Sequence, residues 1–208
     1  IYTGEDTLSL HDALPIWHND TMVWQHGWTD SANKCPSPNF GARTRIPDLV
    51  VIHNISLPPF EYGSGSAVAL FQNQIDASQH PFFSVIANFR VSSHFFIDRT
   101  GELFQCVSCD DAAYHAGVSS FHGEAACNGF SIGIELEGCD FEPFNAVQYE
   151  TLLSLLSQLQ AAYPIKAVTG HQHIAPDRKT DPGHFFDWQY LQQQGVAVDF
   201  NQTSGWGG

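Results

Sequence analysis

The side chains best suited to chemistry are concentrated in one segment, VTGHQHIAPDRKTDPG, residues 168–183. Gly170 and the Pro182-Gly183 pair are turn signals that bound it, so we expect a loop held by a rigid scaffold. Imidazole and carboxylate groups are the ligands of catalytic zinc sites, in which three protein ligands leave a fourth position for water. The segment therefore predicts part of a metal centre. Its ionisable side chains are His171, His173, Asp177, Arg178, Lys179 and Asp181.

A further ligand must come from elsewhere in the chain, and His53 is the natural candidate because it follows an apolar, strand-like run. Spacing alone leaves this assignment open, because no short zinc motif such as H-E-x-x-H is present. A single histidine at a strand end is most often a packing residue, and a loop rich in His and Asp can simply be solvated. The histidines that compete as ligands are His94, His115, His173 and His184.

Composition excludes several classes of protein. The 208 residues carry 8 Lys and Arg against 22 Asp and Glu, a formal net charge of -14. Nucleic-acid binding requires clustered cations, so we expect no nucleic-acid partner. The apolar fraction of 43% predicts a globular chain, and no apolar run approaches the ~20 residues of a membrane-spanning helix. We expect one monomeric domain without membrane insertion.

The five cysteines predict the compartment. They form no even-numbered disulfide framework and no export signal precedes them, so we expect reduced thiols and a cytoplasmic protein. Cys106 and Cys109 form a C-x-x-C, which is half of a zinc ribbon, but no second half follows. We therefore predict buried structural thiols.

The two ends of the chain lack the patterns of its middle. Residues 1–16, IYTGEDTLSLHDALPI, match the conceptual translation of a sequencing adapter. We interpret them as a non-native scar, which also removes His11 as a ligand. We assign the domain to residues 17–200 and a loose tail to residues 201–208.

Strand-like runs position several of the polar residues. LVVIHNIS (49–56) is continuously apolar up to His53 and predicts a strand buried on both faces. Residues 91–98 and 102–107 predict a hairpin around a Thr-Gly turn. SIGIELEG (131–138) alternates, which places Glu135 on the face opposite the isoleucines.

Helical patterns alternate with these strands. FNAVQYETLLSLLSQLQAAYP (144–164) has helical spacing, a capping box of Asn145 with Gln148, and a stop at Pro164. Residues 66–75 are weakly helical, and 186–194 predict a short last helix. The sequence therefore predicts an α/β fold: a single domain with a mixed central β-sheet flanked by helices.

Five strings resemble a known family in their order and spacing. The chain is similar to the cytoplasmic 1,6-anhydro-N-acetylmuramoyl-L-alanine amidases of the AmpD type, within a zinc amidase superfamily that includes peptidoglycan recognition proteins. The resemblance covers roughly residues 27–190. The strings are LVVIHNISLPP, VSSHFFIDRTGELFQ, AYHAGVSSFHG, CNGFSIGIELEG and TGHQHIAPDRKTDPG.

The resemblance implies an activity and a set of residues. The activity is zinc-dependent cleavage of the amide bond between N-acetylmuramic acid, in its 1,6-anhydro form, and L-alanine in muropeptides during cell-wall recycling. Carried across by position, the zinc ligands fall on His53, His171 and Asp181. The catalytic glutamate falls on Glu135 and the catalytic lysine on Lys179, whereas His173 matches no ligand position.

The implied chemistry suits these residue types. Zinc lowers the pKa of a bound water from ~15.7 towards ~7. Glu135 can accept the water proton and pass it to the departing nitrogen, and Lys179 can stabilise the oxyanion. The alternatives are ordinary: Glu135 could be a solvent-facing acid like Glu137, and Lys179 could form only a surface ion pair with a neighbouring aspartate.

Substrate contacts are less defined. We expect Asn54, Arg90, Tyr114 and His115 to contact the muropeptide, with Arg90 suited to a carboxylate; Tyr114 and His115 could equally be packing residues. The chain departs from its relatives at Ala112, at Glu124-Ala125-Ala126, and at Gly129. Two other functions stay open, an amidase acting on intact peptidoglycan and a non-catalytic peptidoglycan-binding module.

Overall fold

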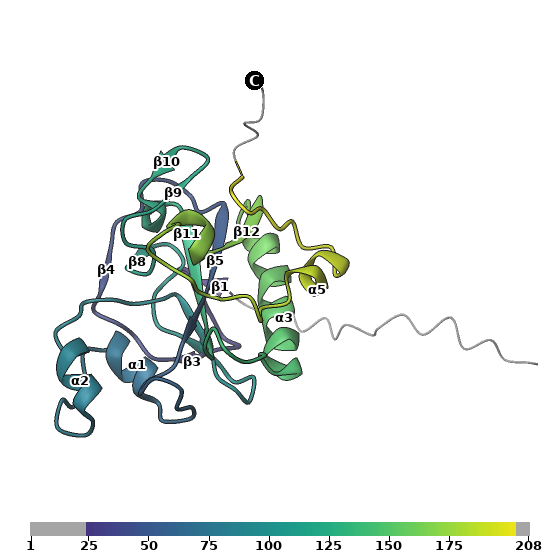
Figure 1. The fold of residues 1–208 in the computed structure, drawn as a ribbon. Coiled ribbons are helices and arrows are strands. Elements are labelled where there is room, and N and C mark those ends of the chain that lie inside the picture. Colours follow the sequence, from purple (N-terminus) through teal and green to yellow (C-terminus); the bar gives the residue numbers. More distant parts are fainter. Residues whose placement is uncertain (1–23, 203–208) are drawn as a thin grey trace, which may run out of the picture.

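A six-stranded mixed β-sheet forms the centre of the computed structural model, which describes residues 24–202 (Figure 1). The strand order is β12-β5-β11-β6-β7-β3. Neighbours β12, β5, β11 and β6 run parallel, β7 is antiparallel to β6, and β3 is parallel to β7. The strands are β3 Asn33–Lys34, β5 Leu49–Ile55, β6 Phe95–Ile97, β7 Leu103–Gln105, β11 Ser131–Glu137 and β12 Ala167–Gly170. The predicted fold class is confirmed.

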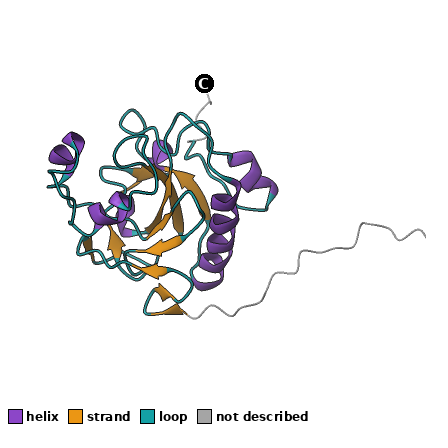
Figure 2. Ribbon diagram, turned by 90° about the horizontal axis from the view of Figure 1, so that it is seen from below, coloured by secondary structure: helices purple, strands orange, loops and turns teal. Residues whose placement is uncertain are grey.

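Helices lie on both sides of this sheet (Figure 2). The long helix α3 (Ala146–Ala162) packs on one face with α5 (Trp188–Gln193), and α1 (Ser66–Phe71) packs on the other face, where α2 (Pro81–Ile86) lies beside it. The predictions for the strand at 49–56, the hairpin, the long helix and the last helix are confirmed, with shorter bounds for the hairpin strands. Within residues 24–202, no helix is long and apolar enough to cross a membrane.

Two short helices were not predicted. The sequence Ser78-Gln79-His80-Pro81 predicts an interruption of secondary structure, but α2 begins at Pro81. Proline is tolerated at the first position of a helix, because the backbone N–H that it lacks would have no partner within the helix. His80 Nδ1 accepts from the N–H of Phe82 at 3.1 Å and so caps the helix. The segment 168–183, expected to be one loop, begins as β12 and the short helix α4 (His171–Ile174).

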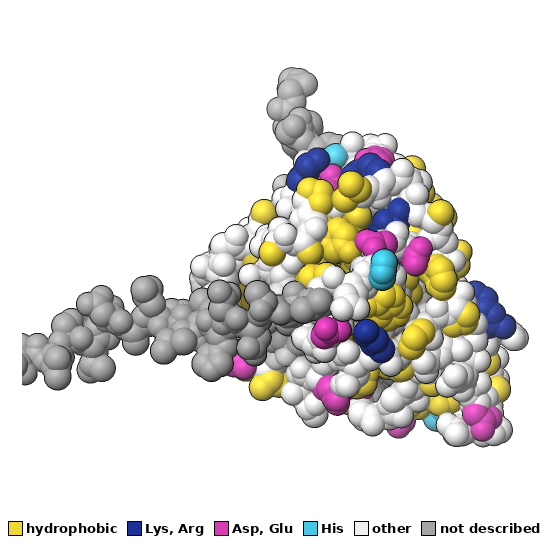
Figure 3. All heavy atoms as spheres, turned by 180° about the vertical axis from the view of Figure 1, so that it is seen from behind, with side chains coloured by type: hydrophobic (Ala, Val, Ile, Leu, Met, Phe, Trp, Pro, Cys, Tyr) yellow, Lys and Arg dark blue, Asp and Glu magenta, His cyan; other side chains and the backbone are white. Residues whose placement is uncertain are grey.

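Small strand pairs and one 3-10 turn connect the main elements. The predicted scar at residues 1–16 and residues 203–208 of the predicted tail lie outside the described residues. On the face shown in Figure 3, Lys and Arg side chains stand singly or in small groups among apolar and acidic ones. The small elements are β1 Trp24–Gln25 with β2 Trp28–Thr29, β4 Phe40–Gly41 with β8 Ala112–Ala113, β9 Ser120–Phe121 with β10 Glu124–Ala125, and η1 Cys127–Gly129.

All five cysteines are free and buried, which confirms the prediction of buried thiols. Cys106 Sγ faces Cys35 Sγ on the neighbouring segment, not Cys109. The C-x-x-C of the sequence is therefore not a pair in the structure.

The central strands β5 and β11 have two different faces. Val50, Ile52 and Ile134 belong to the apolar core under α3. The opposite face of β11 carries Glu135 and Glu137, so the predicted alternation is confirmed. Both acids are buried, however, and Glu137 accepts the backbone N–H groups of Gly63 at 2.6 Å and Arg99 at 3.1 Å. The solvent-facing alternative for these acids is therefore wrong.

Gln148 joins the start of α3 to the ends of two sheet strands. Its Oε1 accepts the N–H of Asn145 at 3.0 Å, as the predicted capping box requires. Its Nε2 donates to the carbonyls of Glu137 at 3.0 Å and Ile97 at 3.3 Å, where β11 and β6 end. The side chain is fully buried, so these groups have no access to water.

Replacing Gln148 with alanine should therefore lower the free energy of unfolding. Gln148→Ala leaves buried backbone groups unpaired, each worth about 1–3 kcal/mol, and urea denaturation would measure the loss. Gln160, exposed on the same helix, provides the control: Gln160→Ala should change the free energy of unfolding by less than about 0.5 kcal/mol. Equal stability of the two variants would contradict the role given to Gln148.

Candidate metal centre

The candidate site lies on the face of β5 and β11 that α3 does not cover. The parallel register pairs His53 with Glu135, so the two side chains emerge from neighbouring strands on the same face. β5 is apolar from Leu49 to Ile52, and its polar residues occur only towards its C-terminal end. This end of a parallel sheet is where ligands commonly bind.

His171 and Asp181 reach the same place from the segment after β12. His171 starts α4 directly after the strand, and the N–H of Gln172 donates to the carbonyl of Asp181 at 2.8 Å, which closes the loop between them. Gly170 permits the close approach, because a Cβ there would lie 2.9 Å from Pro182 Cδ. Asn54 Nδ2 donates to the carbonyl of Pro182 at 3.1 Å and so fixes the loop against β5.

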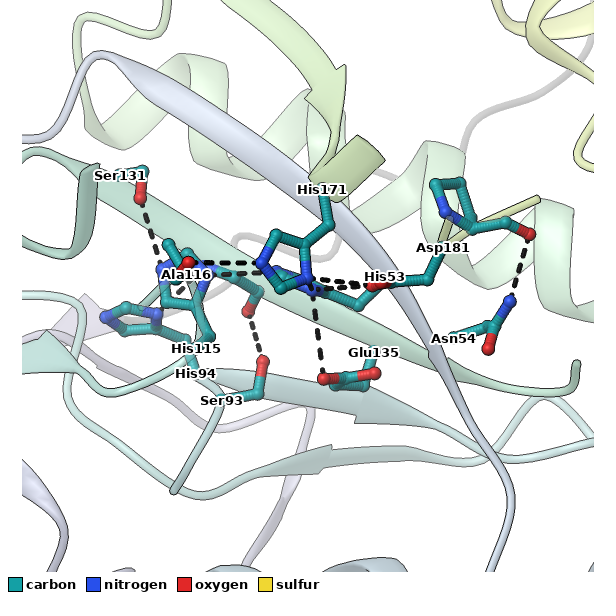
Figure 4. A network of polar contacts seen from close by, with 12 residues as sticks. His53, Asn54, Ser93, His94, His115, Ala116, Ser131, Glu135, His171 and Asp181 are labelled. Atoms are coloured by element: carbon teal, nitrogen blue, oxygen red, sulfur yellow. Dashed lines mark hydrogen bonds and ion pairs between the residues drawn. The ribbon is translucent and has the colours of Figure 1, made fainter. Parts of the chain in front are cut away.

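Three potential ligand atoms converge. His53 Nδ1, His171 Nδ1 and Asp181 Oδ2 each lie 3.0 Å from the other two (Figure 4). Zinc-to-ligand distances of ~2.0–2.2 Å place the ligands of one tetrahedral ion roughly 3–3.5 Å apart. Two imidazoles and a carboxylate are also a typical catalytic donor set with an open fourth position. The residues present therefore fit a zinc ion.

The ionisation of these groups favours cation binding. Burial lowers the pKa of His53 to about 4, and the neighbouring His171 contributes to the shift. Burial alone would raise the pKa of Asp181, but the close contacts of its carboxylate with the His171 and His53 rings outweigh burial and hold that pKa well below its usual value. Neutral imidazole and ionised carboxylate are the forms that bind metals.

Glu135 lies beside this cluster with spare hydrogen-bonding capacity. Its Oε1 is 4.0 Å from His53 Nδ1, and its buried Oε2 has no hydrogen-bond partner. Burial raises the pKa of Glu135 well above its usual value; the nearby Asp181 raises it further and Lys179 opposes the shift. A buried carboxyl group in this state is suited to accepting and returning a proton.

Two cavities adjoin the cluster and share Asn54, Lys179 and Asp181 in their walls. The first, of about 250 Å³, contains His53, Glu135 and His171 in its lining. The second, of about 380 Å³, is lined mostly by loop residues. The structure thus brings Lys179 to the cluster, as the sequence predicted; its role in catalysis stays a prediction.

The four predicted substrate contacts separate in the structure. Asn54 and Tyr114 line the smaller cavity, and the Tyr114 hydroxyl donates to the carbonyl of Phe40 at 2.8 Å. His115 also reaches this cavity but is only 9% exposed, with both ring nitrogens hydrogen-bonded inside the protein. Arg90 lines neither cavity, and its guanidinium donates to the carbonyls of Ala87 and Phe89.

The competing histidines have other partners. His94 Nδ1 accepts the N–H of Gly133 at 3.0 Å, and His173 Nδ1 accepts that of Gly170 at 3.1 Å. His184 is exposed. Among the described residues, the group of His53, His171 and Asp181 is the one found to converge as a potential metal site.

Sequence reasoning did not find the wall of the larger cavity. Phe60 and Phe141 are 61% and 70% exposed, their rings lie 5.9 Å apart, and both line this cavity. Arg178 lines it as well and donates to the carbonyls of Ala116 and Val118, each at 2.7 Å. The available signal was a phenylalanine beside prolines and acids in each of two loops, which is too weak to identify a cavity wall.

Comparison with known proteins agrees with this geometry. The amidase AmpD of Salmonella typhimurium strain SL1344, named a 1,6-anhydro-N-acetylmuramyl-L-alanine amidase, is 50% identical over 171 residues, which cover 80% of this chain and 91% of that protein. Its namesake from Escherichia coli K12 is 49% identical over 171 residues, which cover 80% and 93%.

Solved structures show the same fold. A crystal structure of a selenomethionine derivative of AmpD matches with a TM-score of 0.80 and 47% identity, over 83% of this chain and 98% of that one. The Escherichia coli amidase AmiD, in complex with anhydro-N-acetylmuramic acid-L-Ala-D-gamma-Glu-L-Lys, matches with a TM-score of 0.58 and 30% identity, over 85% and 66%.

A family model described as N-acetylmuramoyl-L-alanine amidase matches residues 43–184, a range that contains the cluster, Glu135 and Lys179. Together with half-identical relatives aligned over four fifths of the chain, this match is decisive. The chain belongs to the N-acetylmuramoyl-L-alanine amidase family.

Proposed function

We propose that this protein hydrolyses the amide bond between N-acetylmuramic acid, in its 1,6-anhydro form, and L-alanine in muropeptides of cell-wall recycling, and that it does so with zinc. The observation that carries the proposal is the convergence of His53, His171 and Asp181 beside the buried Glu135. Relatives between 42% and 50% identical over about 80% of the chain are named for this reaction.

The proposed mechanism assigns a role to each side chain. His53, His171 and Asp181 would hold the zinc, which would supply Lewis acidity to activate water and to polarise the amide carbonyl. Glu135 accepts the proton of the attacking water and transfers it to the nitrogen of L-alanine as the C–N bond breaks. Its raised pKa and unpartnered Oε2 suit a group that carries a proton between these steps.

Lys179 completes this assignment. Its side chain lies in the walls of both cavities, which Asp181 also lines. We propose that its ammonium group stabilises the oxyanion that forms from the amide carbonyl. Asn54 and Tyr114 are proposed to contact the muropeptide, and Arg90 is left out because it lines neither cavity.

Compartment and assembly are part of the proposal. The five cysteines are free thiols, which favours a reducing compartment. We therefore propose a monomeric cytoplasmic enzyme whose partner is a peptidoglycan fragment.

Two other functions are weaker. The second candidate is an amidase that acts on intact peptidoglycan. AmiD of Escherichia coli, another N-acetylmuramoyl-L-alanine amidase, is 37% identical but aligns with only 52% of this chain. A non-catalytic binding module would resemble the peptidoglycan recognition proteins, whose structures match at 15% identity and so share the fold alone. The complete set of converging ligands with Glu135 argues against such a module.

Product analysis tests the proposal directly. Anhydro-muropeptide incubated with the protein should release a peptide with a free L-alanine amino group, seen by mass spectrometry as hydrolysis with addition of water. Chelator should stop the release and added zinc should restore it, because the water is activated by the ion. Faster release from intact sacculi would favour the second candidate, and zinc-loaded protein that releases no peptide would overturn the enzymatic proposal.

Removing the carboxylate ligand should remove metal and activity together. Asp181→Ala deletes one of three donors, so the variant should lose bound zinc, measured by elemental analysis after dialysis, and should lose turnover with it. Asp30→Ala removes an exposed carboxylate that pairs with Lys34 and should retain both. An Asp181→Ala protein with full zinc content would exclude Asp181 as a ligand.

Glu135 should be separable from metal binding. Glu135→Gln keeps the shape of the side chain but cannot take up a proton, so zinc content should persist while kcat falls by about 10²–10⁴-fold. Glu150→Gln, at an exposed position of α3, should leave kcat unchanged. Wild-type turnover of the Glu135→Gln variant would remove Glu135 from the mechanism.

A further inference from the structure

A series of buried hydrogen bonds runs from His53 away from the cluster (Figure 4). His53 Nε2 lies 2.9 Å from His115 Nδ1. His115 Nε2 lies 3.1 Å from Ser131 Oγ, and that hydroxyl lies 2.6 Å from the carbonyl of Cys127. Both His115 and Ser131 are buried.

The protons in this series can be assigned from its far end. A carbonyl only accepts, so Ser131 donates its one hydroxyl proton to Cys127 and must accept from His115 Nε2–H. His115 is neutral because burial disfavours a charged ring and no carboxylate of residues 24–202 forms an ion pair with it. Its Nδ1 is therefore bare and accepts from His53 Nε2–H.

This assignment leaves His53 with one possible tautomer. A neutral imidazole with its proton on Nε2 has a bare Nδ1, which is the atom directed at the cluster. His171 reaches the same state independently, because its Nε2 lies 3.1 Å from the carbonyl of Ala116. Both rings thus present a lone pair to the position between them and Asp181.

The fold holds His115 in place on two sides. The ring packs against Gly133 of β11, where a Cβ would lie 2.5 Å from His115 Cγ. The backbone N–H groups of His115 and Ala116 donate to Asn128 Oδ1 at 3.2 and 2.8 Å. β11 and Asn128 thus hold the His115 side chain and backbone in position.

We propose that His115, oriented by Ser131, is a positioning residue that fixes the metal-binding tautomer and ring orientation of His53. This inference rests on the proposed function, since it gives His53 its role as a zinc ligand. It assigns His115 a role that does not depend on the expected contact with the muropeptide. Partners of this kind typically change metal affinity by about 10–100-fold.

Zinc affinity tests the proposal without depending on turnover. His115→Phe keeps a ring over Gly133 but removes the acceptor, so competition with a chromophoric chelator should show zinc bound about 10–100-fold more weakly. His115→Asn places an amide oxygen close to the position of Nδ1 and should recover part of the loss. Ser131→Ala should weaken zinc binding less than His115→Phe, because it leaves the acceptor in place.

A matched control and a direct measurement separate this role from a structural one. His122 pairs with Asp199 at the surface, so His122→Phe should bind zinc like the wild type. Nitrogen-15 NMR of the zinc-loaded wild-type protein should show Nε2–H tautomers for both His53 and His115, whether or not any variant folds.

Three outcomes would contradict the proposal or its basis. Wild-type zinc affinity in a folded His115→Phe variant would overturn it, and so would an Nδ1–H tautomer of His115. A wild-type protein that binds no zinc would instead overturn the proposed function on which the inference rests.

Discussion

The pairing of β5 with β11 is the constraint on which the site depends. Both strands are buried on both faces. One face is apolar and lies under α3, and on the other His53 follows apolar Leu49 and Val51 and pairs with Glu135. A slip of one residue would exchange these faces. The burial of Ile52 and Ile134 under α3 therefore fixes the register, and the same register places the two polar side chains together. The packing of the core and the geometry of the site therefore both follow from the register of β5 and β11.

Electrostatics in this interior follow from its small number of cations. The chain has a formal net charge of -14, and two carboxyl groups, Glu135 and Asp181, are nearly buried in one cluster with Lys179 close by. Buried carboxylates are stable only when paired, protonated or bound to a metal. Asp181 is held ionised by the imidazoles, while Glu135 is pushed towards its protonated form. Neighbouring acids thus acquire opposite tendencies, as the proposed ligand and the proposed proton carrier require.

Sequence periodicity predicted the longer strands and the long helix, and it missed short elements and contacts between residues far apart in the chain. β5, β11 and α3 contain enough residues for a period to appear, whereas α4 spans only His171–Ile174. Metal ligands must be close in space, and spacing along the sequence did not show which of the competing histidines are. The contact of His53 with Asp181, for example, depends on a loop that the hydrogen bond from Gln172 to Asp181 closes. Resemblance to a family identified the residues that converge, and their roles remain proposals. It also placed His115 at the substrate; the structure shows a ring that is 9% exposed and lines the smaller cavity, and a contact with substrate stays a prediction.

Two of the departures expected from the resemblance, Glu124 and Gly129, have close local contacts in the structure. Glu124 pairs with Arg45 at 2.9 Å, so the acid has a local partner. At Gly129 a Cβ would lie 2.5 Å from Thr44 Oγ1, so Thr44 leaves no room for a side chain. Both positions flank Asn128, which holds the backbone of His115, and neither belongs to the metal-binding group. Because neither position contributes a donor atom or lines either cavity, the metal-binding group does not depend on the side chains found there.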